Sequence, residues 1–453
     1  MLQTMINAWK IADLRKKILF TAFILLVFRI GSAITIPFVD IGPGGILGDA
    51  ANQGTFLAYL NMLTGDAFNF ATILAMSITP YINSSIIMQL LTVAIPALER
   101  LQKEGEEGRK KIATITRYVT IGLAVLQSTA YYIFLRNGGA GEATTFLLTN
   151  QYGALYTGFP AFLQAAVIVT VLTAGAGLTM WLGERINVNG IGNGVSIILF
   201  AGIIARIPQM VQQFGAYFSH GGVWIPMTII AILSIFASIA FIVWMDSAER
   251  RIPVQYTKHV VGRKMYGGQS SHIPIKVNMT GVLPIIFASS ILSLPPTIGM
   301  FVTPTEGSFW YGFLNAFRFD SPWYLLMYFL MIIGFAYFYA SIQYDPTEMS
   351  NNIRNNHGMI PGYRPGEPTV AYIRRILNHV TLLGALMLSA VALFPIAFSL
   401  VSAIIIQGVF GQQGAMQIAL GGTSIIIMVG VALETVKQLE SQMMLRHYKG
   451  FLD

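Results

Sequence analysis

Apolar stretches of about twenty residues recur along the whole chain and alternate with shorter polar stretches. About 20 apolar residues in a helix cross a hydrocarbon core roughly 30 Å thick. The pattern therefore predicts an all-α integral membrane protein with ten transmembrane helices. We expect the spans at residues 18–36, 68–97, 118–135, 162–182, 191–207, 223–245, 279–300, 323–342, 376–401 and 419–439.

The second apolar stretch is too long for one ordinary span, and Pro80 divides it. Proline lacks a backbone donor and its ring clashes with the preceding helical turn. We expect residues 65–79 to form a short re-entrant segment and residues 80–97 to form the spanning helix. Irregular backbone at membrane depth is tolerated only inside protein or beside a water-filled cavity, so this segment should be enclosed. A simple proline kink is the alternative.

The composition agrees with a membrane protein, because 54% of the residues are hydrophobic and only 11% are charged. Soluble domains carry about 25% charged residues. Of the 28 Lys and Arg residues, 24 lie in alternate segments that include both ends of the chain. Basic residues in short loops collect on the cytoplasmic side. We therefore expect both termini in the cytoplasm, and Arg29, Arg136, Arg206 and Arg318 toward the outer side.

Two long basic loops on the cytoplasmic side, residues 246–278 and 344–375, are punctuated by Gly and Pro. We expect them to project and to bind a partner, although they could serve only as orientation signals. Five spans precede and five follow an outer loop. This count predicts an N-terminal half (1–206), an outer hinge loop (207–222) and a C-terminal half (223–453), with the halves inverted relative to each other.

Catalytic chemistry finds no support in the sequence. Cysteine is absent, as are the HExxH, GxSxG and Walker A motifs, so no catalytic residue, metal site or cofactor is expected. The GIGNG stretch at 190–194 lacks a βαβ context; we expect its glycines to allow close helix packing and Asn193 to face inward. A secondary transporter with discontinuous helices and an intramembrane enzyme remain as alternatives, but the former needs buried ionisable groups that the spans lack.

Several stretches resemble the SecY/Sec61-alpha family, the central channel subunits of Sec translocons. They occur in the family's order and are ITPYINSSIIMQLL (78–91), WLGERINVNGIGNGVSIILFAGI (181–203), ERRIPVQY (249–256), GGQSSHIPIKVNMTGVLPIIFASS (267–290), GMIPGYRPGEPT (358–369) and GGTSIIIMVGVALETVKQLESQ (421–442). The resemblance implies a passive, non-enzymatic pore in the bacterial plasma membrane. Secretory proteins cross through such a pore unfolded, and membrane proteins leave it sideways into lipid.

The family's channel parts map onto this chain as follows. The resemblance implies a constricting pore ring at Ile78, Ile82, Val195, Leu199, Ile286 and Ile427. It implies a plug helix on the outer side within residues 65–76, including Phe68, Asn69, Phe70, Ile73 and Leu74. From the residues alone, the six ring positions would be ordinary apolar core.

A lateral gate is implied between the second and third spans on one side and the seventh and eighth on the other. Its polar contacts would be Asn83, Ser84, Ser85, Gln89 and Asn278, for which ordinary packing polarity between helices is an equal alternative. The resemblance implies docking of the SecA motor or the ribosome, including ribosomal RNA, at Arg250, Arg251, Lys258, Arg263, Lys264, Arg354, Arg364, Arg374 and Arg375. It also implies small SecE and SecG partners and substrates that carry signal sequences.

Overall fold

The computed structural model describes residues 8–41, 45–46, 61, 63–136, 147, 158–222, 224–256, 259–261, 264–266, 270–295, 308–317, 321–410 and 421–449. A helix occupies the position of every predicted span. These helices are α2 (Ala12–Gly31), α4 (Thr79–Ala94), α6 (Glu106–Arg136), α7 (Phe159–Asn189), α8 (Gly194–Ala205), α10 (Trp224–Ser247), α11 (Leu283–Leu292), α14 (Pro322–Gln343), α16 (Glu367–Phe410) and α17 (Gly422–Lys449). The described residues also form α5 (Pro96–Lys103), α9 (Ile207–His220), α13 (Phe309–Ala316) and α15 (Pro346–Asn355).

The length and the apolar surface of the helices suit a lipid bilayer. Within the described residues, seven helical stretches are long and apolar enough to cross a membrane, and α4 with α5 makes an eighth that is bent by 101°. Large apolar side chains face outward, including Phe23, Leu233 and Phe236, which are 61%, 63% and 66% exposed. Extended apolar surface of this kind is unfavourable in water. The prediction of an all-α, multi-pass membrane protein is confirmed.

Prolines and caps fix where helices begin. Pro80 lies in the first turn of α4, where its missing N–H interrupts no helical hydrogen bond, so the division of the second apolar stretch at this proline is confirmed. Pro96 starts α5, and α4 therefore ends at Ala94, before the expected residue 97. Asn193 is exposed and caps α8, its side chain accepting from the Val195 N–H at 3.1 Å; the expectation that it faces inward is wrong.

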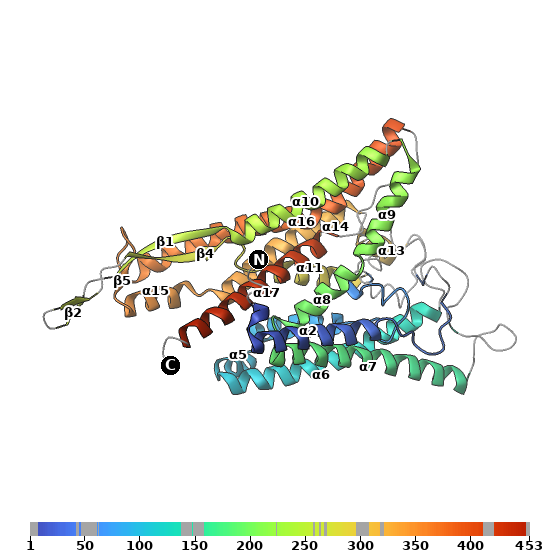
Figure 1. Ribbon diagram of the computed structural model, residues 1–453, viewed down its shortest axis with the longest axis horizontal. Helices are drawn as coiled ribbons and strands as arrows, with labels where there is room; N and C mark the ends of the chain where they lie inside the picture. Colours follow the sequence, from blue (N-terminus) through green and yellow to red (C-terminus); the bar gives the residue numbers. More distant parts are fainter. Residues whose placement is uncertain are drawn as a thin grey trace.

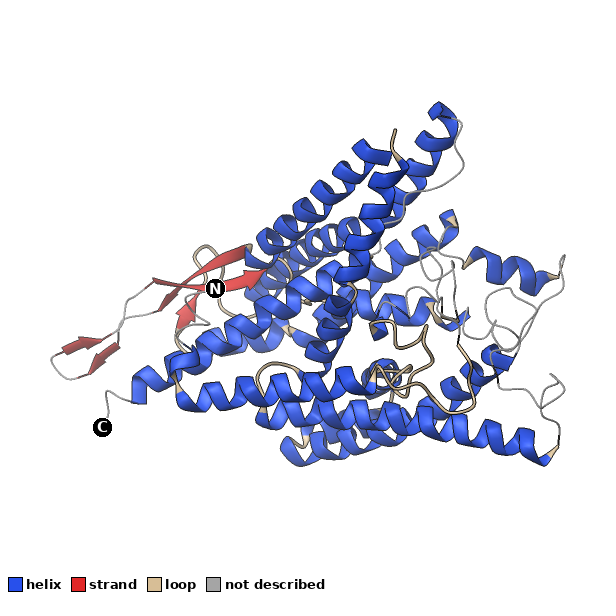
Figure 2. Ribbon diagram, turned by 45° about the vertical axis from the view of Figure 1, so that its right-hand side comes forward, coloured by secondary structure: helices blue, strands red, loops and turns tan. Residues whose placement is uncertain are grey.

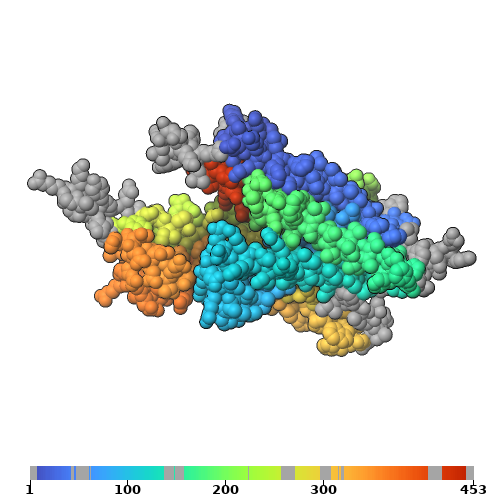
Figure 3. All heavy atoms as spheres, turned by 90° about the horizontal axis from the view of Figure 1, so that it is seen from below, coloured from blue at the N-terminus to red at the C-terminus, as the bar shows by residue number. Residues whose placement is uncertain are grey.

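The helices form two bundles (Figure 1). In the first, α2, α4, α6 and α8 pack on α7, and in the second, α10, α11, α14 and α17 pack on α16. Figure 3 shows the first bundle across one face, with residues near 250 and 350 at one end and residues near 310 along the lower edge toward the other end. The expected inversion of the two halves stays a prediction.

α8 and α9 lead from the first bundle to the second (Figure 1). The segment expected as an outer hinge loop, 207–222, is helical over most of its length, because α9 occupies Ile207–His220; its role as a hinge stays a prediction. The segment is helical because Met210, Phe214 and Tyr217 recur at helical spacing and pack on the central core, while Pro208 suits the first turn.

The two long basic segments fold together into one unit. Strand β1 (Glu249–Tyr256) pairs antiparallel with β4 (Ser270–Lys276), and its far end pairs with β5 (Gly358–Met359). A second small sheet, β2 (His259–Val261) with β3 (Lys264–Tyr266), extends the hairpin (Figure 2). Ile252 of the hairpin, Ile353 of α15 and Ile373 of α16 share an apolar core. We call this unit, with α15 and the start of α16, the basic end.

Both terminal helices reach toward the same end of the molecule. Lys437 of α17 pairs with Asp246, the penultimate residue of α10, at 2.7 Å between Nζ and Oδ2. Lys17 near the start of α2 donates to Gln442 of α17 at 3.4 Å. The start of α2 and the end of α17 therefore lie on the side where β1 begins, as Figure 1 also shows.

Candidate functional site

An apolar cluster at the centre of the molecule brings together the six predicted ring positions. Ile78, Leu199 and Ile427 are buried in it, and Ile82, Val195 and Ile286 are partly buried against it. The first bundle supplies α4 and α8, and the second supplies α11 and α17. Residues from distant parts of the chain thus converge on one apolar core.

Local helix geometry aligns the ring positions in pairs. Ile78 is the N-cap of α4, and the Ile82 N–H donates to the Ile78 carbonyl at 3.0 Å. Pro80 therefore does not separate these two side chains. Val195 and Leu199 lie one turn apart in α8.

The re-entrant segment at 65–78 is a succession of turns rather than the short helix that the resemblance implies. Positive φ angles at Asp66 (71°), Ala71 (40°) and Ser77 (46°) break any helix there. Phe68, Asn69 and Leu74 are buried, Ile73 is half-buried, and Phe70 is 36% exposed. The segment is enclosed by protein, as its irregular backbone requires.

The first bundle holds this segment by hydrogen bonds to the backbone of the segment. The Tyr131 hydroxyl donates to the Phe68 carbonyl at 2.6 Å, and the two rings lie 4.7 Å apart. The Ile36 N–H donates to the Ala71 carbonyl, and the Ile73 N–H donates to the Ile34 carbonyl, each at 2.9 Å. The segment is therefore pinned to α6 and to the strand-like stretch that follows α2.

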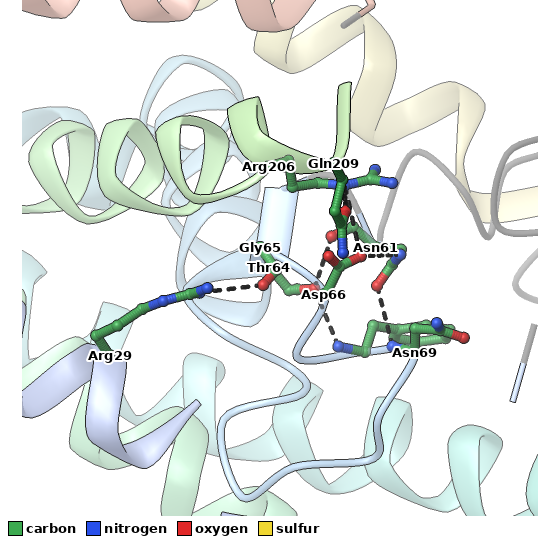
Figure 4. Close-up of polar contacts among 9 residues, drawn as sticks. Arg29, Asn61, Thr64, Gly65, Asp66, Asn69, Arg206 and Gln209 are labelled. Carbon is green, nitrogen blue, oxygen red and sulfur yellow. Dashed lines mark hydrogen bonds and ion pairs between the residues drawn. The ribbon is translucent and has the colours of Figure 1, made fainter. Parts of the chain in front are cut away.

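A polar cluster joins the same segment to α8 and α9 (Figure 4). Arg206, at the junction of these helices, pairs with Asp66 at 3.4 Å between Nε and Oδ1. The side chains are 8% and 13% exposed. This ion pair was not predicted from the sequence. Two features of the sequence could have indicated the pair: basic residues are scarce on the expected outer side, and the irregular segment contains a carboxylate.

The predicted gate residues fall into two groups. Ser84 donates to the Thr116 carbonyl of α6 at 2.8 Å, and Gln89 donates to Ser85 within α4 at 3.4 Å, so these three have ordinary packing contacts. Asn83 and Asn278 are buried, and neither side-chain oxygen has a hydrogen-bond partner in the described part of the chain. Asn83 lies on α4 and Asn278 shortly before α11, two helices that contact each other.

The predicted docking arginines lie on the basic end. Arg250, Arg354, Arg364, Arg374 and Arg375 are exposed. Arg251 is also exposed and pairs with Glu249 at 2.7 Å. Lys264 belongs to β3, while Lys258 and Arg263 lie outside the described residues.

Comparison with known proteins decides the family. The model of the SecY family matches residues 72–436. The chain belongs to the SecY family. It is 41% identical to the protein translocase subunit SecY of Streptomyces galbus and 40% identical to that of Mycobacterium tuberculosis, in each case over 100% of both chains. The resemblance seen in the sequence is confirmed.

Solved structures show the SecY fold as well. One described as a protein conducting channel matches 94% of this chain and 92% of its own, with a TM-score of 0.61 at 17% identity. Sec61 in a canine ribosome–channel complex matches the same shares, with a TM-score of 0.57 at 16% identity. The arrangement of helices is therefore that of SecY and Sec61 channels.

Proposed function

We propose that this protein is the channel subunit of a protein translocase, and that unfolded polypeptides pass through the central apolar cluster. The observation that carries the proposal is the convergence of six aliphatic side chains from four helices of both bundles. Full-length identity with protein translocase subunits supports the same function.

The cluster suits a seal that must open for varied chains. A narrow constriction of branched aliphatic side chains is unfavourable for water and therefore resists ion leakage. The same side chains carry no hydrogen-bonding groups that would select one passing sequence over another. Chemically, the ring excludes ions and accommodates polypeptide without reacting with it.

Hydrophobic segments leave sideways between α4 and α6 on one side and α11 and α14 on the other. Asn83 and Asn278 contribute to this lateral gate, because their buried side-chain oxygens find no hydrogen-bond partner among the residues that the structure describes. An unpaired buried polar group costs free energy, so these residues bias the gate toward an arrangement in which they find partners.

The basic end faces the cytoplasm of a bacterial cell, with both termini on that side of the plasma membrane. Its exposed arginines suit acidic protein surfaces and phosphate, which supports docking of the SecA motor or of the ribosome with its RNA. Sec61 is bound to the ribosome in one structural relative. SecE and SecG complete the channel, and the motor or the ribosome supplies the driving force.

Site-specific crosslinking tests the pathway. A photoreactive residue is placed at Ile82, Leu199 or Ile286, and a secretory chain is arrested during translocation in membrane vesicles. We expect all three positions to label the chain and a control at Phe236, which is 66% exposed on α10, to label lipid instead. Absence of labelling from all three positions during active translocation would remove the central cluster from the pathway.

A further inference from the structure

The buried pair of Asp66 and Arg206 carries an inference that rests on the proposed channel function (Figure 4). Its two side chains are only 13% and 8% exposed and meet at 3.4 Å. Removing one partner from such a pair is strongly destabilising, because the other charge remains buried and uncompensated. Asp66 and Arg206 therefore depend on each other for as long as the re-entrant segment stays enclosed.

A polar frame sets the positions of both charges. Asn61 donates to the Asp66 carboxylate at 2.7 Å and accepts from the Asn69 N–H at 3.0 Å. Arg206 also donates to Gln209, one turn into α9, at 3.3 Å. The carboxylate is thus fixed by the re-entrant segment, and the guanidinium is fixed by α9.

Close backbone packing brings the turn against α8. A Cβ on Gly65 would lie 2.8 Å from the Gly202 carbonyl oxygen, and a Cβ on Gly202 would lie 2.7 Å from the Leu63 carbonyl oxygen. Gly65 has a φ of +64°, which glycine adopts without strain. Arg29 of α2 donates to the Gly65 carbonyl at 3.2 Å. These contacts hold the turn in the position from which Asp66 can pair with Arg206.

Arg206 stands where the chain leaves the first bundle for the second. It closes α8 and caps α9, and the Met210 N–H donates to its carbonyl at 3.0 Å. The other contacts of the segment described above are made with the first bundle, at Tyr131, Ile34 and Ile36. Because α9 packs on α10 of the second bundle, a movement of α9 with that bundle would displace Arg206 from Asp66.

We propose that Arg206 is a positioning residue for the plug: its ion pair with Asp66 latches the re-entrant segment in the closed channel and is broken when the α8–α9 junction moves. In the closed state, little water reaches the two charges, so each is stabilised by its partner rather than by hydration. In the open state, the water-filled pore hydrates both charges, and the pair is dispensable. The latch thus responds to the movement of the two bundles.

The natural absence of cysteine allows a direct measurement. The reporter is Ala75→Cys, since Ala75 is 1% exposed and reacts only after the segment leaves its seat. The translocase complex is reconstituted in vesicles, and the rate of labelling by a soluble maleimide is measured without substrate. We expect Arg206→Gln and Asp66→Asn each to raise the rate roughly tenfold or more, because each leaves one buried charge unpaired.

A double variant distinguishes a latch from general loosening. Asp66→Asn with Arg206→Gln leaves no buried charge, so we expect it to label more slowly than either single variant. Arg136→Gln, which removes an exposed arginine from the end of α6, is the matched control and should leave the rate unchanged. Strictly additive effects, or unchanged rates in both single variants, would overturn the proposal.

Two further measurements keep the outcome decisive. If a neutral single variant does not accumulate, Asp66→Glu keeps the charge but displaces the carboxylate; labelling at the parent rate would then count against the latch. Translocation of a secretory precursor is measured separately. If the labelling effects are non-additive but the protein translocates no precursor, the proposed function is refuted and the latch is retained. If translocation is normal but the variants leave the labelling rate unaltered, the latch is refuted and the proposed function is retained.

Discussion

At the scale of single residues, the packing of the re-entrant segment against α7 depends on a glycine. Gly175 of α7 faces this segment, and a Cβ there would overlap the carbonyl oxygen of Ile73. Backbone atoms cannot rotate aside as the end of a side chain can. Gly177, two residues further along α7, has open space around the corresponding position. The two glycines therefore allow a matched comparison within one helix.

We predict that Gly175→Ala destabilises the closed protein by about 1–3 kcal/mol, the usual cost of overpacking, and lowers its melting temperature. Gly177→Ala should instead be neutral or stabilising by up to about 1 kcal/mol through helix propensity. Thermal unfolding of the purified complex in detergent measures both. Equal shifts in the two variants would contradict the close contact between α7 and the segment.

Residue-scale expectations from the sequence succeed where the cause is local. Pro80 acts on its own helical turn, so its place at the start of α4 could be predicted. The partnership of Asp66 with Arg206 could not, because the two residues are far apart in the chain and meet only through tertiary packing. The predicted inward orientation of Asn193 is wrong for a different reason. Its side chain accepts hydrogen bonds from the Val195 and Ser196 N–H groups at the start of α8, and this capping role fixes its orientation.

At the scale of elements, a two-residue strand joins the two basic segments. Tyr256 and Gly358 pair across β1 and β5, and a Cβ on Gly358 would lie 3.0 Å from the side chains of both Tyr256 and Val254. The sequence predicts two long basic loops but not their union, because so short a strand has no detectable periodicity. The unit nevertheless has its own apolar core.

We predict that Gly358→Val separates β5 from β1 and exposes the hairpin. Its branched side chain must displace neighbours that pack in the core of the basic end, which costs about 1–3 kcal/mol. The measurement is the rate of limited proteolysis between residues 246 and 278 in the purified protein in detergent. Met359→Ala, at a neighbouring side chain that is 42% exposed, is the control. Equal proteolysis of both variants would show that β5 does not restrain the hairpin.

At the scale of the whole molecule, the apolar cluster that we propose as the seal is shared by both bundles. Ile427 of α17 is 2% exposed and lies in the same cluster as Ile78 and Leu199 of the first bundle. The sequence alone leaves these positions indistinguishable from ordinary core, since an aliphatic residue on a helix suits both roles. Family resemblance names the positions, and the fold brings them together.

We predict that Ile427→Asn and Ile286→Asn each raise ion conductance of the reconstituted channel and relax its selectivity for signal sequences. A polar amide in the constriction makes water more favourable there. Ile427→Val, which removes one methylene at a cost of about 0.5–1.5 kcal/mol, should keep the seal dry. Planar-bilayer recordings compare the three. Unchanged conductance in both asparagine variants would count against the ring.

The length of α16 has a mechanical consequence for the basic end. Its 44 residues correspond to about 66 Å of helix, roughly twice the hydrocarbon thickness. The helix starts at Glu367, beside the turn that carries Arg364, and its first turns share a core with the β1–β4 hairpin. A docked partner that pulls on this turn therefore pulls on one continuous helix, in which Pro395 removes a single backbone hydrogen-bond donor. Force applied outside the membrane is delivered along its length to the second bundle, and from there to the opposite surface.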